Sequence, residues 1–299
     1  MRTYLLCTAA LLLAAPLGAQ QDRQKIDTTF AFEKGGVVNL GHVSGDIMVT
    51  GWNKLEAKVY AVIETGYLEA TLTSSRIQIN AKSRRNRMGE SRYELSVPIG
   101  TEVRVSTVSG DIAVRGTTGE VTVNAVSGNI EVRDATRAEI GTVSGDVRAE
   151  KLGGLVRLRT VSGDATLDNL VGELRGKSVS GTLRVRGALS GLEYQTMSGD
   201  IEFRGDIKPD GIYNASTHSG DVRVILPENI AADLDLKTYS GDMRTEFPLT
   251  LRPGSEAAQR GRGREMRTTI NGGGARISLG TFSGDITIQK GAARPNKED

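Results

Sequence analysis

The stretch from residue 103 to residue 150 decides the fold: it reads VRVSTVSGDIAVRGTTGEVTVNAVSGNIEVRDATRAEIGTVSGDVRAE. Within it, Ser-Gly followed by Asp or Asn occurs three times, beginning at Ser109, Ser127 and Ser144. Apolar and polar residues alternate on both sides of each triplet, as over residues 121–124. A period of two is typical of strands with one buried face. The stretch therefore predicts short strands that meet at glycine-containing corners.

The same triplet recurs through most of the chain. Over eight consecutive corners, from Ser109 to Ser240, the serines lie 17 to 21 residues apart, which is too regular for chance. Two variants, Ser127-Gly128-Asn129 and Ser180-Gly181-Thr182, fill gaps in the series. The complete triplets are Ser44, Gly45, Asp46; Ser109, Gly110, Asp111; Ser144, Gly145, Asp146; Ser162, Gly163, Asp164; Ser198, Gly199, Asp200; Ser219, Gly220, Asp221; Ser240, Gly241, Asp242; and Ser283, Gly284, Asp285. Two short strands are unstable alone, so we expect coils that stack at about 4.8 Å and share one apolar interior.

Each residue type of the triplet suits a structural turn. Glycine permits the positive φ of a sharp corner, and Ser, Asp and Asn hydrogen-bond nearby backbone groups. Threonine stands two residues before most of the serines, as at Thr107 and Thr142, and we expect a ladder of hydroxyl groups there. The residue directly before the serine forms another column: Val43, Val108, Val126, Val143, Val161, Val179, Met197, His218, Tyr239 and Phe282.

Two regions depart from this period. Between Ser44 and Ser109 we expect strands near residues 58–64, 68–72, 76–80 and 93–97, a basic loop at 82–87, and a small antiparallel cap. Between Ser240 and Ser283 we expect a loop at 259–264 and a strand at 266–270. The predicted fold is an all-β, single-stranded β-solenoid with coils of 18–21 residues, irregular N-terminal coils and one C-terminal loop insertion.

The ends of the chain have the composition of an exported protein. Arg2, the apolar run of residues 4–15 and small residues up to Ala19 predict a signal peptide over 1–19, too short to span a bilayer. The β-solenoid would then occupy 20–290 and a disordered tail 291–299, with no membrane span in the mature chain. Because Cys7 is the sole cysteine, the mature chain would contain neither a disulfide nor a thiolate site.

The charge balance argues against nucleic acid as a partner. Lys and Arg number 38 and Asp and Glu number 36, so the chain lacks a strong basic excess. We expect a periplasmic or cell-surface location, an envelope protein or glycan as partner, and end-to-end self-association through exposed strand edges.

The recurring corner, together with both ends of the repeat array, resembles a known family. The opening Gly41–Ile47 with Gly51-Trp52, and the closing Asn271–Gly274 with Ser283–Ile286, are similar to the bacterial "putative adhesin" family, also called the toastrack domain. The resemblance covers essentially the whole mature chain. It implies an exported envelope β-solenoid of unknown function, with no catalytic residues to transfer.

A search for reactive groups assigns no catalytic, cofactor-binding or metal site. Stacked corner aspartates suggest Ca²⁺, but one carboxylate per coil is too few ligands, and turn capping is the favoured interpretation. His42 and His218 are interpreted as substituted members of the repeat columns, and the repeated serines lack a His-Asp set. The sequence favours a non-catalytic, adhesin-like envelope domain. A sensory or scaffolding module that binds a protein is the alternative, and a glycan-active β-helix enzyme is less favoured.

Overall fold

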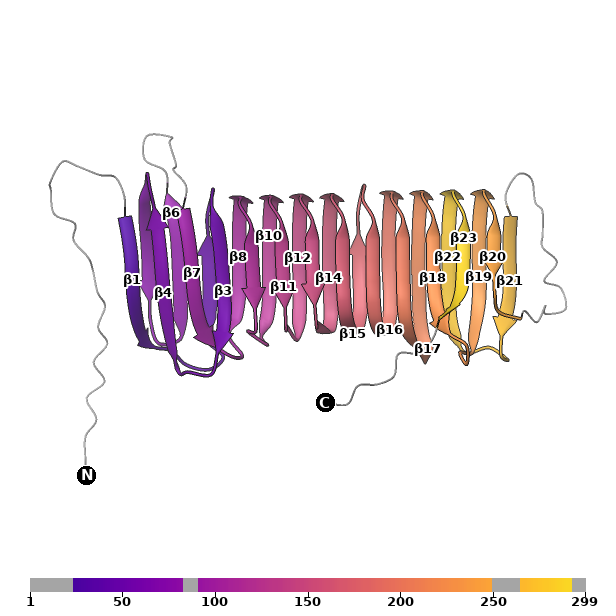
Figure 1. Cartoon of the computed structure of the whole chain (residues 1–299), viewed down its shortest axis with the longest axis horizontal. Coiled ribbons are helices and arrows are strands. Elements are labelled where there is room, and N and C mark those ends of the chain that lie inside the picture. The colour runs from indigo at the N-terminus through magenta and orange to yellow at the C-terminus, as the bar shows by residue number, and fades with distance from the viewer. Residues whose placement is uncertain (1–23, 83–90, 249–263, 292–299) are drawn as a thin grey trace, which may run out of the picture.

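The protein is a straight rod built from β-strands alone, in a computed structural model that describes residues 24–82, 91–248 and 264–291 (Figure 1). The described residues contain no helix, so the expectation of an all-β fold is confirmed. None of the described residues forms a helix that could cross a membrane. The predicted signal peptide, the basic loop from residue 83, the loop at 259–263 and the tail from residue 292 lie outside the described residues.

The strands form two faces of one continuous sheet. From the N-terminal end of the rod, the first face consists of β1 (Gln24–Ala31), β4 (Glu56–Ile63), β7 (Ser91–Pro98), β3 (Asp46–Trp52), β9 (Ile112–Arg115), β11 (Ile130–Arg133), β13 (Val147–Glu150), the first parts of β15 (Ala165–Lys177), β16 (Leu183–Ser198) and β17 (Ile201–Ser219), then β18 (Val222–Pro227), β23 (Ile286–Gly291) and β20 (Met243–Thr245).

The second face runs parallel to the first along the same axis. It consists of β5 (Tyr67–Leu72), β6 (Arg76–Lys82), β2 (Val37–Gly41), β8 (Glu102–Ser109), β10 (Glu120–Ser127), β12 (Arg137–Ser144), β14 (Gly153–Ser162), the second parts of β15, β16 and β17, then β22 (Ala275–Ser283), β19 (Ala232–Ser240) and β21 (Arg264–Ile270). We call two strands that meet at a Ser-Gly corner, such as β10 and β11, a rung.

Neighbouring rungs pair in parallel and in register, which makes the fold solenoid-like. Ser127 lies beside Ser109 on one side and Ser144 on the other. Because the side chains of a strand alternate, this register places equivalent residues of every rung on the same side. In β10, Val121 and Val123 are buried while the residues on either side of each are more exposed. The buried residues of all rungs form one apolar interior along the rod.

The rungs do not follow chain order at the two ends. The last rung in sequence, β22 and β23, lies between β17–β18 and β19–β20, where Figure 1 shows its yellow strands beside orange ones. The first rung, β2 and β3, is likewise enclosed: β6 and β7 pair with its outer side, and β8 and β9 with its inner side. Stacking in simple chain order would have left both of these rungs nearer the ends.

Antiparallel strands cover both ends of the column. At the N-terminal end β4 pairs antiparallel with β1 and β7, and β5 pairs antiparallel with β6, so the expected antiparallel cap is present. At the other end β21 pairs antiparallel with β19. Phe32 and Phe247 are buried near the two ends and close the apolar interior there.

Candidate binding surface along the corner

The corner glycines are in contact with one another along the rod. All ten have positive φ, between 111° and 153°. A β-carbon on Gly145 would overlap the carbonyl oxygen of Gly128, and one on Gly163 would overlap that of Gly145. The corners of successive rungs thus stack so closely that only glycine fits.

The corner aspartates form a second ladder beside the glycines. Oδ1 of Asp111 accepts a hydrogen bond from the backbone N–H of Asn129 at 2.8 Å, and Oδ1 of Asn129 accepts one from the N–H of Asp146 at 3.2 Å. Asp164 accepts in the same way from Thr182. Asn129 therefore continues the ladder, whereas the ladder is interrupted at Thr182, whose side chain does not accept a hydrogen bond from the backbone N–H of Asp200. Each such bond joins a side chain of one rung to the backbone of the next.

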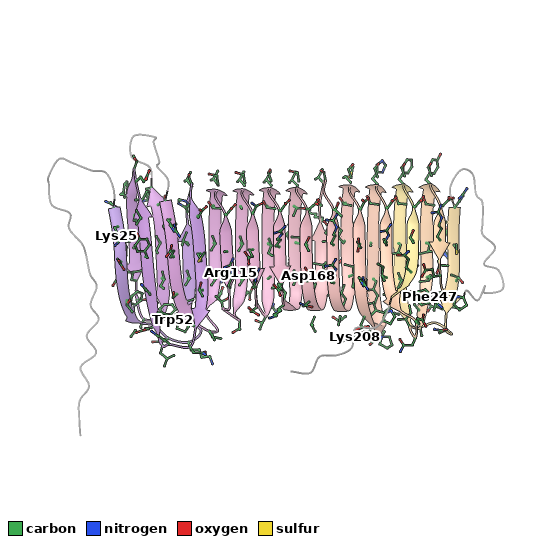
Figure 2. The ribbon with its side chains drawn as sticks, in the orientation of Figure 1. Lys25, Trp52, Arg115, Asp168, Lys208 and Phe247 are labelled. Atoms are coloured by element: carbon green, nitrogen blue, oxygen red, sulfur yellow. The ribbon has the colours of Figure 1, made fainter. Side chains whose placement is uncertain are left out.

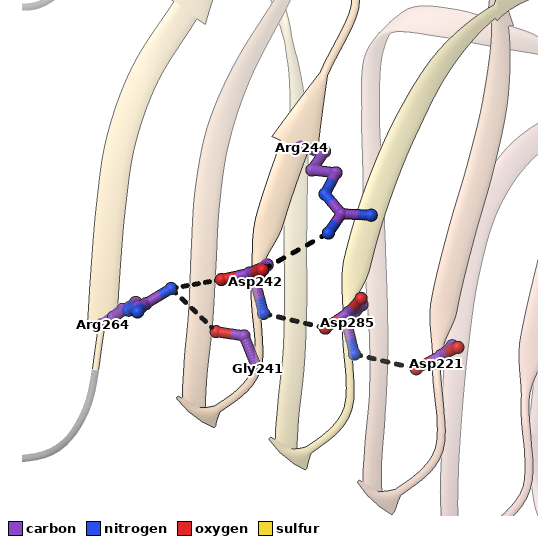
Figure 3. A network of polar contacts seen from close by, with 6 residues as sticks. All are labelled: Asp221, Gly241, Asp242, Arg244, Arg264 and Asp285. Atoms are coloured by element: carbon purple, nitrogen blue, oxygen red, sulfur yellow. Dashed lines mark hydrogen bonds and ion pairs between the residues drawn. The ribbon is translucent and has the colours of Figure 1, made fainter.

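The ladder ends on an arginine at the C-terminal end of the rod. Figure 3 shows Asp221, Asp285 and Asp242 in succession, with each backbone N–H bound to the preceding carboxylate. Arg264 of the antiparallel strand β21 then donates to the Asp242 carboxylate and, at 3.2 Å, to the Gly241 carbonyl oxygen. Hydrogen bonding from Arg264, aided by its charge, lowers the pKa of Asp242. The guanidinium thus occupies the place that a further rung would take.

The threonine column is buried, but its hydroxyl groups mostly bind backbone oxygens. Thr160 donates to the Ser178 hydroxyl of the next rung at 2.8 Å, as a side-chain ladder would require. Thr217, in contrast, donates to the Gly199 carbonyl at 3.1 Å and Thr281 to that of Gly220 at 3.0 Å. Other members, such as Thr107 and Thr142, donate to the carbonyl of the corner serine in their own rung, so the column stabilises the corner backbone both within and between rungs.

The residues directly before the corner serines form an exposed apolar ridge. We call this set the ridge; in order along the rod it comprises Val43, Val108, Val126, Val143, Val161, Val179, Met197, His218, Phe282 and Tyr239. Its valines, Met197, Phe282 and Tyr239 are each between 42% and 57% exposed, and His218 is exposed as well. Figure 2 shows a row of side chains projecting along one long edge of the rod.

The aromatic end of the ridge is a stack of rings. The ring of Phe282 lies parallel to those of His218 and Tyr239, with centroids 4.7 Å apart in both cases. This spacing is that of the strands themselves, because each ring belongs to a separate rung. Both faces of Phe282 are therefore covered by its neighbours.

A hollow of about 470 Å³ lies on the first face, on the other side of the corner from the ridge. Ala113 forms part of its lining, at an outward position where the adjacent rungs have Met48 and Glu131. We call it the trough. Its polar lining consists of Asp46, Asp111, Asn129, Asp146, Arg92, Glu94, Arg115, Glu131 and Arg148. The small side chain of Ala113 leaves this space between longer ones.

Charges at the trough are held in place by ion pairs and the aspartate ladder. Arg115 donates to both carboxylate oxygens of Glu131, at 3.0 and 2.7 Å, and Arg92 pairs with Glu94 at 2.6 Å. The hydrogen bonds from Arg115 hold the pKa of Glu131 below its usual range. The trough is thus a polar surface with fixed acceptors and fixed positive charge (Figure 2 labels Arg115).

The two histidines occupy different environments. His42 takes a buried threonine position, and its Nδ1 lies 3.2 Å from the Tyr93 hydroxyl oxygen. Burial lowers the pKa of His42 to about 4, and burial raises that of Tyr93 to about 12. His218 belongs to the ridge. Neither lies beside a corner serine in a nucleophile–base arrangement, and the described residues contain no cluster of three His, Cys, Asp or Glu side chains suited to a metal ion.

The sequence indicated the corner but not the two surfaces beside it. Outward exposure of the ridge follows from the alternation, since each ridge residue comes directly after a buried threonine position. The signal was therefore present in the repeat. The trough was missed because it depends on Ala113 having long neighbours, which only the order of rungs reveals.

Comparison with known proteins identifies the family. The family model described as Toastrack DUF4097 matches residues 89–289. A "putative adhesin" from Parabacteroides distasonis is 9% identical, with 90% of this chain and 97% of that chain covered and a TM-score of 0.49. A "putative adhesin" from Bacteroides fragilis is 11% identical, with 91% and 100% covered and a TM-score of 0.41. A "putative lipid binding protein" from Parabacteroides distasonis is 13% identical, with 90% and 97% covered and a TM-score of 0.31. A search of curated proteins finds no match.

The family model spans about two thirds of the chain and includes all but the first of the corners on which the rod is built. The resemblance seen in the sequence is thereby confirmed, and the chain belongs to the toastrack family.

Proposed function

We propose that the protein is an exported, non-catalytic, adhesin-like domain of the cell envelope that binds a polyhydroxylated polymer in the trough. The observation that carries the proposal is the row of corner aspartates at its edge. Asp46 and Asp111 each use one oxygen, Oδ1, to accept a backbone N–H of the next rung. The second oxygen of each takes no part in the ladder and serves as a fixed acceptor for hydroxyl groups.

The lining of the trough also contains donors. Arg148 and the amide nitrogen of Asn129 lie in the lining and can donate to ring or hydroxyl oxygens of a sugar. The volume of about 470 Å³ falls within the range of roughly 300–1,000 Å³ of small-ligand sites. A linear glycan running along the rod would meet a new aspartate or asparagine at every rung, about 4.8 Å apart.

The chemistry of the lining favours binding over hydrolysis. A glycosidase needs one carboxylic acid that donates a proton and a second carboxylate opposite to it. Here Asp46, Asp111 and Asp146 accept backbone N–H groups, and the Arg115 ion pair keeps Glu131 ionised. The alternative of a scaffolding module with a protein partner is favoured by a different feature, the ridge.

The test compares matched changes inside and outside the trough. Asp111→Asn removes a carboxylate but keeps the ladder acceptor, as Asn129 does naturally; Asp221→Asn makes the same change far along the rod. Ala113→Leu fills the trough, and Ala188→Leu adds the same three carbon atoms at an exposed position of β16 outside the trough. Binding would be measured by calorimetry against purified bacterial envelope polysaccharides, with dextran as a neutral comparison.

We expect Asp111→Asn and Ala113→Leu to weaken binding of at least one polysaccharide about tenfold or more, a loss typical of one charge-assisted hydrogen bond. Asp221→Asn and Ala188→Leu should bind as the unaltered protein does. Absence of binding to every polysaccharide, or equal losses in the test and control variants, would overturn the proposal.

A further inference from the structure

The ridge is an unusual feature for the surface of a soluble rod. Ten apolar or aromatic side chains, one per rung, stand in a single straight line, each about half exposed. Together they offer on the order of 700 Å² of apolar surface, more than the largest patch of roughly 300–600 Å² on a typical monomer. Scattered exposed apolar residues are ordinary, whereas a continuous patch of this size marks an interaction site.

Two kinds of occupant fit the ridge poorly. A glycan stacks its apolar face on the face of an aromatic ring, but both faces of Phe282 are covered by His218 and Tyr239. A bilayer surface with anionic lipids attracts basic residues. The ridge is instead bordered on one side, three residues further along eight of the ten corners, by aspartates of the ladder, which outnumber the three basic residues Arg159, Lys177 and Lys237 on its other side. These carboxylates would meet anionic headgroups and repel them.

A second copy of the same rod fits in spacing and in area. Its ridge has the same separation between successive side chains, about 4.8 Å, because the strands set it. The side chains of the two ridges can therefore lie opposite one another over all ten rungs. The ridge surface of about 700 Å² per copy is close to the roughly 800 Å² per partner of a standard stable interface. A partner without this period would meet only a few of the ten side chains.

The charges beside the ridge select the relative direction of the two copies. On the corner side lies the aspartate row; on the other side lies an outward row of seven neutral residues with Arg159, Lys177 and Lys237, which contains no acidic residue. A twofold axis parallel to the rods places the aspartate row of one copy opposite the row without acidic residues in the other, so that no carboxylates face one another. An antiparallel pair would place aspartates opposite aspartates, which repel.

We propose that two copies of this chain dimerise through their ridges, side by side and parallel, so that each ridge residue lies opposite its own counterpart. The dimer would leave the trough of each copy open, because the trough lies on the other side of the corner. The proposed dimer therefore does not depend on whether the trough binds a polysaccharide. It also differs from end-to-end association, which would use β1 and β5 of one copy and β20 and β21 of the next.

The first experiment measures the oligomeric state of the full chain by sedimentation equilibrium over a wide concentration range. The test variant carries Val126→Thr, Val143→Thr and Val161→Thr, changes that keep the shape and strand preference of valine but remove apolar methyl groups from the interface. Val171→Thr is the matched control, because Val171 is 62% exposed and lies on the opposite edge of its rung. We expect the triple variant to raise the dimer dissociation constant about 100-fold or more, and Val171→Thr to leave it unchanged.

The second experiment tests the direction of the two copies. In a Cys7→Ser background, which has no other cysteine, Val126→Cys should form a disulfide with its counterpart on mild oxidation, whereas Val171→Cys should not. A chain that stays monomeric at all concentrations, or a dimer that the triple variant leaves intact, would overturn the proposal. A dimer lost in the triple variant but not cross-linked through Val126→Cys would overturn the parallel arrangement.

Discussion

At the scale of single residues, the choice of residue at the corner is limited by the backbone atoms that an added β-carbon would overlap. The glycine column is required twice over, by positive φ and by the neighbouring carbonyl oxygen. The aspartate column is less demanding, because asparagine performs the same hydrogen bonding at position 129. Sequence variation within the triplet follows this order: glycine is present in all ten corners, and the third residue changes in two of them.

A first prediction concerns Gly145→Ala. Its φ of 130° is a region that residues with a β-carbon avoid at a cost of about 1–3 kcal/mol, and the new methyl group would also overlap Gly128. We expect the free energy of unfolding to fall by at least about 2 kcal/mol in urea denaturation. Gly280→Ala is the control: its φ is ordinary, and the added carbon would lie 3.8 Å from the Ser216 side chain, so its effect should be small. Equal effects would contradict this account of the corner.

A second prediction concerns His42 and acid. Burial holds the folded-state pKa of His42 at about 4, whereas an unfolded histidine titrates near 6.5. The neutral form is thus favoured by folding, so that this stabilisation is complete above pH 6.5 and is lost as the pH falls toward 4. The loss should reach on the order of 2 kcal/mol.

The measurement for His42 is urea denaturation at pH 7.5 and pH 4.5. In His42→Thr, which restores the residue type of its column, the difference in unfolding free energy between the two pH values should shrink by that amount. Carboxylates with lowered pKa, such as Asp27 and Glu131, contribute their own acid sensitivity in both proteins. An unchanged difference would mean that His42 is not the group responsible.

At the scale of secondary-structure elements, position in space and position in sequence disagree at both ends. The strands β22 and β23 are the last described in the chain, yet each is paired on both sides. The outermost strands, β1 and β5 at one end and β20 and β21 at the other, are each paired on one side only among the described residues. Protection of a strand from local unfolding should therefore depend on whether it is paired on one side or on both sides, and not on its position in the sequence.

Hydrogen exchange followed by mass spectrometry tests this third prediction. Ordinarily the terminal residues of a chain exchange first, because they fray. Here the backbone amides of β22 should exchange as slowly as those of β12 in the middle of the rod, and those of β21 and β1 much faster. Faster exchange in β22 than in β21 would contradict the enclosed position of the last rung.

The strands themselves could be predicted from the sequence, and their order at the ends could not. Alternation around residues such as Val121 and Val123 identified the strands, and the triplets identified the corners. The rungs at Ser240 and Ser283, however, have the same columns of Thr, aromatic residue, Ser, Gly and Asp. Either would stack on the rung of Ser219 with equal ease, so the pattern contains no information on which one does. The order depends on β21, which pairs antiparallel with β19 and so closes the end.

At the scale of the whole molecule, the rod has no single dominant source of stability. It has one apolar interior, a ladder of backbone hydrogen bonds and side-chain hydrogen bonds from rung to rung. Most ion pairs are exposed, and such pairs contribute roughly 0–1 kcal/mol each. Loss of one rung therefore exposes apolar surface on both of its neighbours.

A fourth prediction follows for metal removal. The aspartates at the corner already have hydrogen-bond donors from the next rung, so the rod needs no cation to neutralise them for folding. We expect the midpoint of thermal unfolding, followed by circular dichroism, to be the same in EDTA and in millimolar Ca²⁺. A higher midpoint in Ca²⁺ that disappears in Asp146→Asn would show that the carboxylate row binds the ion.

The enclosed last rung has a consequence for how the chain is made. A polypeptide is synthesised from its N-terminus, so residues 232–245 emerge before residues 275–291, beside which they finally lie. Before residues 275–291 are available, the unpaired edges of β17 and β18 can pair only with β19 and β20. These two strands have the same Ser-Gly-Asp corner but are not the neighbours of β17 and β18 in the finished rod. Therefore β19 and β20 either stay unpaired or must leave a premature partner, and the order of the rungs can be completed only after residues 275–291 have been synthesised.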